Sequence, residues 1–208
     1  MTIESLFDDP DGTREEIMKA TYEALCTHGY ADLTIQRIGD EFPKSKSLLY
    51  HHYDSKDALL LDFLAYMLEH FETGVPREDH PDAAAHLRAV FDHVLPDELD
   101  EGRREFTSAM VELQAQAAHD PEYREHFTRS TRFFHDRFVT IIENGIEQGV
   151  FRDVDPDRVA TLLMATIDGA RFQRVTTEGD DDIAAVRDEL QAYVETRLHV
   201  DGESEDDE

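Results

Sequence analysis

Lysine is nearly absent from this chain, and positive charge as a whole is scarce. The 208 residues include 20 Lys plus Arg against 48 Asp plus Glu, a formal net charge of -28. All four lysines lie in the first 56 residues, and Lys44, Lys46 and Lys56 fall in one short stretch. Within that stretch, residues 42–53 (FPKSKSLLYHHY) contain no acid. An acidic protein that keeps one small face cationic is expected to meet a polyanion there, and duplex DNA is the ordinary case.

Cysteine pairs, long apolar runs and a leader segment are also missing. Cys26 is the single cysteine, so no disulfide forms within the chain, and we expect it to be buried as a small apolar residue. No run approaches the roughly 18 apolar residues of a membrane helix. The start, MTIESLFDDPDG, lacks the basic residues and apolar core of a signal peptide. We expect a cytoplasmic protein with no membrane contact.

The motifs of common catalytic and metal sites are likewise absent. The sequence has no HExxH or CxxC spacing, no GxGxxG, no GxSxG and no Walker loop. His86 and His93, like His119 and His126, lie seven residues apart, which is a weak metal signal. We therefore expect no metal, no cofactor and no enzymatic activity.

The excess of acid predicts a halophilic source, because concentrated salt shortens the screening length to roughly 3 Å at 1 M and relieves self-repulsion. The alternative is an ordinary acidic protein with a disordered acidic tail, which 201–208 (DGESEDDE) resembles. That tail supplies only six of the 48 acids, so it does not explain the total.

Hydrophobic periodicity predicts an all-α protein of about nine helices. Thr13 followed by Glu16 matches a capping box, and Ser45 and Ser55 can cap later helices. No alternation long enough for a sheet is present. The expected helices are 13–28, 34–41, 45–53, one from 56, 82–95, about 103–118, 121–148, 156–177 and 182–199.

The short helices at 34–41 and 45–53, joined by a tight turn, match a helix-turn-helix. Over residues 14–60 the sequence resembles the N-terminal domain of the tetracycline-repressor (TetR) family of transcriptional regulators. The stretch LYHHYDSKDAL at 49–59 fits the end of that family's recognition helix and the start of the next helix. The resembling residues are Gly29, Thr34, Ile35, Ile38, Ser45, Leu49, Tyr50, His51, His52, Tyr53, Ser55, Lys56 and Leu59.

The resemblance implies contacts with the DNA backbone at four positions. Thr34 and Lys56 begin helices, where backbone N–H groups add to phosphate binding. Tyr50 and His51 stand at the far end of the reading helix. Thr34 is a helix cap in either case, and Lys56, like Lys46, could be a solvated charge. His52 could pack or contact the backbone. Leu49 and Tyr53 are expected in the core.

The resemblance also implies which residues face the major groove. Lys46, Ser47 and Leu48 occupy the groove-facing positions, and Gln36 can contribute from the preceding helix. A lysine there favours guanine, and Leu48 could touch a thymine methyl group.

The turn departs from the family pattern of small residue, Gly, apolar residue and Ser. It reads Phe42-Pro43-Lys44-Ser45, and Pro43 cannot supply the positive φ of glycine. We expect another turn conformation, with Lys44 as an added phosphate contact and Ser45 at the start of the reading helix.

Charge marks a domain boundary near residue 55. Residues 1–56 hold 11 acids against six Lys plus Arg, and residues 57–208 hold 37 against 14. We expect a DNA-binding domain over 1–55, a helical effector-binding and dimerisation domain over 56–200, and a disordered acidic tail over 201–208.

In this family the larger domain dimerises and senses a ligand. Apolar stripes on the last two helices predict a four-helix dimer interface, although such stripes could instead pack within one subunit. The residues of this interface are Val159, Leu163, Ile167, Ala170, Ile183, Val186, Leu190, Tyr193 and Val194.

Aromatic residues and methionines on the central helices predict a pocket for a small, largely apolar effector, unless they are simply core. Its expected residues are Phe63, Tyr66, Met67, Phe91, Phe106, Met110, Phe134, His135, Phe138 and Phe172.

The leading hypothesis is a homodimeric repressor that binds a palindromic operator in double-stranded DNA and is released by a small-molecule effector. One alternative is a small all-helical enzyme or carrier that binds an apolar molecule and has no affinity for DNA. Another is a module in which the helix-turn-helix docks a second protein. Specific binding to DNA separates the first hypothesis from the other two.

Overall fold

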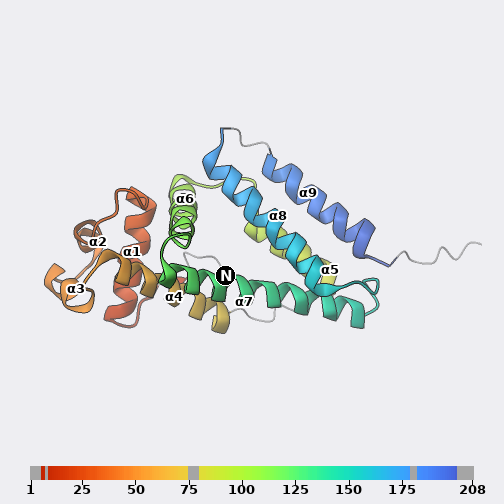
Figure 1. Ribbon diagram of the computed structural model, residues 1–208, viewed down its shortest axis with the longest axis horizontal. Helices are drawn as coiled ribbons and strands as arrows, with labels where there is room; N and C mark the ends of the chain where they lie inside the picture. Colours follow the sequence, from red (N-terminus) through yellow and green to blue (C-terminus); the bar gives the residue numbers. More distant parts are fainter. Residues whose placement is uncertain (1–5, 8, 75–79, 179–181, 201–208) are drawn as a thin grey trace, which may run out of the picture. The chain divides into compact units, whose positions relative to one another are not determined.

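The computed structural model describes residues 6–7, 9–74, 80–178 and 182–200 and is all-helical over them, as the periodicity predicts (Figure 1). Its one β feature there is an isolated bridge between Phe151 and His199. The α-helices in the described residues are α1 Thr13–His28, α2 Ile35–Glu41, α3 Lys46–His52, α4 Lys56–Gly74, α5 Ala83–Val94, α6 Glu101–Gln116, α7 Pro121–Glu147, α8 Pro156–Thr176 and α9 Asp182–Tyr193.

Side-chain caps fix most of these helix starts. Thr34, Ser45 and Asp82 each accept a hydrogen bond from a backbone N–H of the first turn. Asp100 does the same for α6 through the Arg103 N–H at 2.9 Å, so α6 begins two residues earlier than periodicity alone predicts. Helix α9 ends at Tyr193, and a π-helical turn, Val194–Leu198, follows it directly.

The expected capping box of α1 is wrong. The N-cap is Gly12, which makes no side-chain cap, and Thr13 is already the first helical residue. Thr13 and Glu16 both contact the Lys44 ammonium instead, with the Thr13 hydroxyl at 3.2 Å and Glu16 in an ion pair. A lysine 31 positions along the chain thus engages both side chains that the capping box would use.

The chain forms two compact units. The first contains the described residues up to 74 together with Leu99–Thr131, and the second contains those between 80 and 98 together with the described residues from Arg132 onward. Helix α7 contributes its first part to one unit and its second part to the other. The boundary expected near residue 55 falls between α3 and α4.

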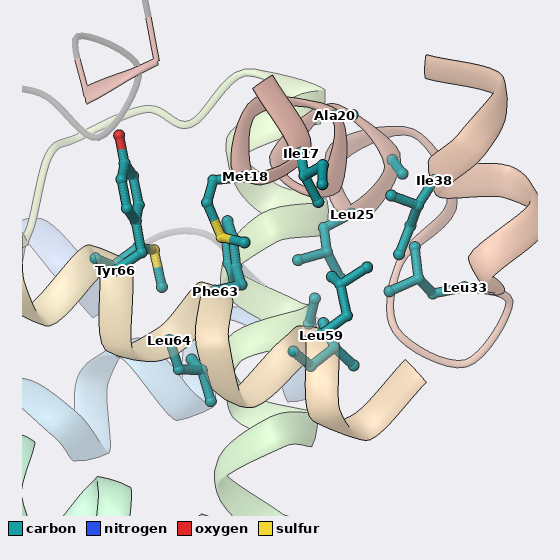
Figure 2. Packing of buried hydrophobic residues seen from close by; sticks show 14 of the residues in the cluster. Ile17, Met18, Ala20, Leu25, Leu33, Ile38, Leu59, Phe63, Leu64 and Tyr66 are labelled. Carbon is teal, nitrogen blue, oxygen red and sulfur yellow. The ribbon is translucent and has the colours of Figure 1, made fainter. Parts of the chain in front are cut away.

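The first unit is built around apolar faces of α1, α4 and α6 (Figure 2). Ile17 and Leu25 of α1 and Phe63 of α4 are fully buried, and Ile38 brings α2 onto the same cluster. Cys26 is partly buried and packs against this cluster, close to the small apolar role expected of it. Burying this surface stabilises the unit by roughly 25 cal/mol per Å² of apolar area. Helices α2 and α3 therefore rest on a continuous core.

The second unit packs α5, α8, α9 and the later part of α7 around a separate cluster. Helices α8 and α9 lie side by side (Figure 1). Gly145 of α7 is required here, because a Cβ at this position would lie 2.1 Å from the ring of buried Phe151. Gly149 then adopts φ of 71°, the left-handed conformation that ends the helix.

Candidate DNA-binding site

Helices α2 and α3 form the helix-turn-helix that the sequence predicts. Ile38 of α2, Phe42 of the turn and Leu49 of α3 are buried, and these three side chains fix both helices on the first unit's core. Phe42 and Ser45 are extended, with φ of -78° and -64°. No non-glycine residue in the described chain has a positive φ, so the turn does adopt a conformation compatible with Pro43.

The face of this motif that points away from the core is polar and solvent-exposed. Tyr50 is 54% exposed, and Lys46 and Leu48 are partly exposed. Because Leu49 alone of α3 is fully buried, the helix presents most of its perimeter to solvent. The remaining exposed residues of this face are Thr34, Gln36, Lys44, Ser45, Ser47, His51 and His52. The structure therefore places most of the predicted DNA-binding side chains on this accessible motif, while Leu48 also packs against the first unit's core and Lys56 begins α4.

Each lysine of this region also has a partner inside the protein. Lys44 pairs with Glu16, and Lys46 pairs with Asp40 of α2. The Lys56 ammonium lies 4.3 Å from the centre of the Tyr30 ring, a cation–π contact. All three side chains remain partly or fully exposed, so DNA could compete for them.

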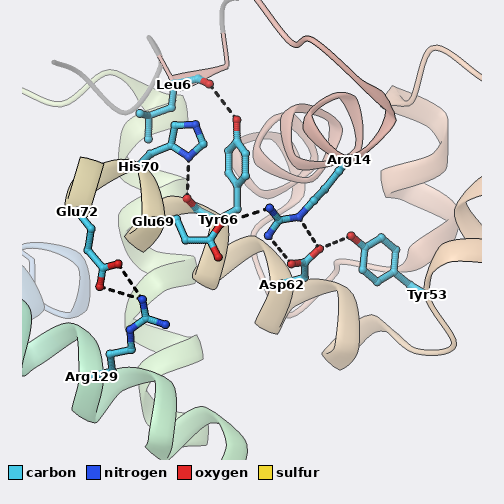
Figure 3. A network of polar contacts seen from close by, with 9 residues as sticks. All are labelled: Leu6, Arg14, Tyr53, Asp62, Tyr66, Glu69, His70, Glu72 and Arg129. Atoms are coloured by element: carbon cyan, nitrogen blue, oxygen red, sulfur yellow. Dashed lines mark hydrogen bonds and ion pairs between the residues drawn. The ribbon is translucent and has the colours of Figure 1, made fainter. Parts of the chain in front are cut away.

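A polar network ties the end of α3 to α4 and α1 (Figure 3). The Tyr53 hydroxyl donates a hydrogen bond to Asp62 of α4. Arg14 of α1 donates to both carboxylate oxygens of Asp62, at 2.6 and 3.2 Å, and reaches Glu69 at 3.3 Å. Sequence reasoning missed this network, although a lone acid within LLLDFLAYM was a visible signal.

The network shifts the pKa values of its members. Burial alone would raise the pKa of the Asp62 carboxyl, but the hydrogen bonds from Arg14 and Tyr53 outweigh burial and lower it. Burial, followed by the Asp62 carboxylate, raises the pKa of the Tyr53 hydroxyl. Asp62 is therefore ionised and Tyr53 neutral at physiological pH, which are the states that this hydrogen bond requires.

Two further contacts support α4 within the same unit (Figure 3). Arg129 donates to both oxygens of Glu72, at 2.9 and 2.8 Å. The Tyr66 hydroxyl reaches the Leu6 carbonyl at 3.5 Å. Helix α4 is thus held along its length by side chains from α1, α3, α7 and the N-terminal segment.

Comparison with protein-family models covers nearly the whole chain. The model described as bacterial regulatory proteins, tetR family, matches residues 17–63, which include the helix-turn-helix. The model described as the C-terminal domain of BetI-type transcriptional repressors matches residues 57–199. The chain belongs to the TetR family. It is a DNA-binding transcriptional regulator of the helix-turn-helix type and not an enzyme.

Individual TetR-family proteins agree with this assignment. A TetR transcription regulator from Haloarcula marismortui is 36% identical, with a TM-score of 0.79 over 90% of this chain and 98% of that one. A putative regulator from Saccharomonospora viridis, in complex with choline, has the same fold at 24% identity, with a TM-score of 0.77 over 90% and 97%. The repressor AcnR of Corynebacterium glutamicum is 24% identical over 91% of this chain and 96% of its own.

The residues expected to bind an effector divide between the two units of this TetR-family chain. Five of them, Phe63, Tyr66, Met67, Phe106 and Met110, lie in or against the first unit's core. Phe91 and Phe138 lie in the second core, and the His135 ring is 3.3 Å from the Asp157 carbonyl. Phe134 and Phe172 are exposed, by 37% and 53%.

The residues expected at the dimer interface all belong to, or pack against, the second unit's own core. Seven are buried within the protomer: Val159, Leu163, Ile167, Ala170, Ile183, Leu190 and Val194. Val186 and Tyr193 are partly buried against them. The apolar residues that α8 exposes lie on another side of the helix and include Leu162, which is 47% exposed, and Phe172.

No described helix is long and apolar enough to cross a membrane.

Proposed function

We propose that this TetR-family protein represses transcription by binding a palindromic operator as a homodimer, and that a small, largely apolar effector releases it. The observation that carries the proposal is the exposed polar surface of α2 and α3, with Lys44 in the turn between them, Lys46 on α3 and Lys56 at the start of α4. Lys46, Ser47 and Leu48 would face the major groove. Thr34, Lys56, Tyr50 and His51 would contact the backbone.

The DNA-binding claim is tested by a mobility shift at high KCl with DNA from upstream of the protein's own gene. We expect a specific shift that Lys46→Ala and Tyr50→Ala abolish or weaken by about tenfold, since a good base or backbone contact contributes about 1–3 kcal/mol. Lys19→Ala is the matched control, because Lys19 is the one lysine outside this region. A shift equally sensitive to Lys19→Ala would contradict the proposed face.

For dimerisation we retain α8 and α9 but assign the contact to the exposed side of α8. Leu162, Ala165, Gly169 and Phe172 recur at spacings of three and four, and all are exposed. A Cβ at Gly169 would meet nothing within 4 Å, so this position leaves room for a partner helix. A second copy of the chain is the natural occupant, because a palindromic operator requires two-fold symmetry.

Light scattering coupled to gel filtration tests this interface. Leu162→Glu and Phe172→Glu should each yield monomers while the helical circular-dichroism signal is kept, because both side chains are exposed and support no core. Thr140→Glu, at an exposed threonine of α7 in the same unit, is the control and should remain dimeric. Dimers that persist in both Leu162→Glu and Phe172→Glu would contradict the proposed interface.

For the effector we favour the first unit, where aromatic rings gather. Phe7 stacks on Tyr22 at 4.8 Å and on Phe63 at 6.0 Å, and Tyr22 meets Phe106 at 5.0 Å. An apolar molecule that separates these rings would alter the packing of α1 against α4. Asp62 of α4 binds both Arg14 of α1 and Tyr53 at the end of α3, so this change would reach α3. This coupling gives a route from effector binding to the position of α3.

Thermal unfolding with small probes tests the effector site. Indole and benzene represent apolar ligands, and choline represents the ligand of the Saccharomonospora viridis protein. A probe at 100 times its Kd stabilises the folded chain by about 2.7 kcal/mol. Phe63→Leu should abolish the shift, and Phe91→Leu in the other core should leave it. The reverse pattern would place the site in the second unit.

A further inference from the structure

The side chain of Lys46 does not extend from the helix-turn-helix but folds back over α2. A Cβ added at Gly39 would lie 3.0 Å from Lys46 Cγ and 3.3 Å from Cδ. Gly39 is itself buried, and the lysine stem occupies the space that a side chain would fill. Glycine in the interior of a helix is destabilising by roughly 0.5–1 kcal/mol relative to alanine, so the space has an energetic cost.

The charged end of Lys46 is held as well. Its ammonium forms an ion pair with Asp40 and lies 3.4 Å from the Gln36 carbonyl. Both partners stand on α2, so the lysine spans from the start of α3 to the preceding helix. The side chain of Lys46 is 40% exposed and that of Asp40 is 61% exposed, which leaves the pair open to exchange with an anion from solvent.

We infer that Asp40 is a positioning residue, which holds Lys46 over Gly39 until DNA provides a better partner. The inference rests on the proposed function, since it assumes that this face binds DNA. Asp40 competes directly with DNA for the same ammonium group. Gly39, Asp40 and Lys46 together are called the Lys46 latch below.

The latch acts on DNA binding because Lys46 must leave Asp40 before it can contact either a phosphate or a base edge. Breaking the ion pair costs the same free energy in both complexes. A lysine that binds a phosphate releases a condensed cation, which gives about 0.9 of salt slope per contact. A guanine edge offers two acceptors in fixed geometry and offsets the cost more fully than one phosphate oxygen does. The latch therefore lowers affinity for any DNA that Lys46 contacts.

Two variants open the latch by different means and keep Lys46. Asp40→Asn removes the carboxylate with little change in shape. Gly39→Ala keeps every charge but fills the space under the Lys46 stem, so the flexible Lys46 side chain must move. Asp32→Asn is the matched control, because Asp32 is an acid just before α2 that pairs with Arg37 at 3.7 Å and has no contact with Lys46.

The first measurement is affinity for a mixed-sequence duplex across a KCl series, beside affinity for the upstream DNA. Asp40→Asn and Gly39→Ala should each bind the mixed duplex about two- to fivefold more tightly, the range that an exposed ion pair supports. Their salt slope should steepen by up to about one. Affinity for the upstream DNA should rise by at least as much, because the same ion pair is broken in both complexes. Asp32→Asn should match the wild type.

The second measurement needs no DNA. Amines of the free protein are acylated and mapped by mass spectrometry, with Lys19 as the internal reference. The Lys46 amine should react faster in Asp40→Asn and Gly39→Ala than in the wild type, and the Lys44 amine should not change. This readout separates the latch from the proposed function: faster acylation without any DNA binding by the wild type would overturn the function alone.

Three results would overturn the latch itself. The first is an unchanged rate of Lys46 acylation in both variants. The second is a gain in non-specific affinity that Asp32→Asn shares, which would be a general effect of charge. The third is a gain in non-specific DNA affinity in Asp40→Asn that Gly39→Ala does not show. In that case the space at Gly39 would have no part in holding Lys46.

Discussion

The lysines of the helix-turn-helix and two arginines of the second unit, Arg174 and Arg187, have partners of different kinds. Lys44 and Lys46 each hold one carboxylate at a partly exposed site. Arg174 is 7% exposed, and it donates to the carbonyls of Pro96 and Asp97, the latter at 2.8 Å. Arg187 likewise reaches the Leu95 carbonyl at 3.2 Å and the Asp97 carboxylate at 2.6 Å.

The difference shows how a chain with few cations divides them between structure and function. The planar guanidinium group suits a buried site, because it satisfies several acceptors in fixed directions. These two arginines fasten the end of α5 and the following loop to α8 and α9. The lysines form ion pairs at exposed sites, which an incoming anion can replace. Arg174 and Arg187 are structural, and the lysines are the cations that we propose for DNA contact.

The largest effect should follow loss of Arg174. Arg174→Met leaves the carbonyls of Pro96 and Asp97 without their donor, and we expect the free energy of unfolding to fall by about 2–4 kcal/mol. Arg174→Lys should recover little, since an ammonium cannot reach both acceptors in the same geometry. Chemical denaturation at fixed KCl measures both. Full recovery in Arg174→Lys would remove the distinction between the two kinds of cation.

An intermediate effect on the free energy of unfolding is expected at Asp62, which accepts hydrogen bonds from Arg14 within the first unit. Asp62→Asn should lower the free energy of unfolding by about 1–2 kcal/mol, because Arg14 and Tyr53 both lose a charged acceptor. The folded pKa of Asp62 lies below its ordinary value near 4. Its contribution is therefore complete above pH 4 and is lost as the pH falls through the folded pKa. The gap between wild type and Asp62→Asn should close below pH 4; a gap that widens there would refute this pKa direction.

The smallest effect on folding should come from the lysines. Lys44→Ala and Lys56→Ala should change the free energy of unfolding by no more than about 0.5–1 kcal/mol, the range of exposed pairs and cation–π contacts. The same variants should weaken DNA binding measurably. A lysine variant as destabilising as Arg174→Met would show that these lysines, too, are structural.

Salt separates the two kinds of contact in the wild type. The dense negative charge predicts that thermal stability rises between about 0.1 M and 2 M KCl, because screening relieves repulsion between acids. Operator binding should lose little over the upper part of this range, since the lysines exchange one anionic partner for another. A fall in Tm with added salt would contradict the halophilic interpretation of the composition.

The fold was largely predictable because its signals are local. Helical periodicity, Ser45 and Thr34 as caps, and Pro43 in the turn depend only on neighbouring residues. One error has a distant cause and the other a local one. Lys44 draws Thr13 and Glu16 away from a capping box, which no local pattern could reveal. The early start of α6 came from overlooking one aspartate, Asp100, as a cap.

The candidate site was predictable as a set of residues but not as a set of contacts. The acid-free stretch at 42–53 indicated the exposed motif, yet the carboxylates that neutralise it, Glu16 and Asp40, lie outside that stretch. Apolar stripes have the same ambiguity, since a buried face looks alike whether its partner is the same chain or another. Leu163 and Leu162 are adjacent, and only the structure shows that one is core and the other is exposed.

The most direct test is a crystal structure of the protein bound to its upstream DNA. The α2–α3 face should lie on the duplex, with the Lys46 ammonium released from Asp40 and within hydrogen-bond distance of a guanine edge or a phosphate oxygen. A complex in which another face of the molecule contacts DNA, or in which Lys46 stays on Asp40 in the groove, would contradict the account.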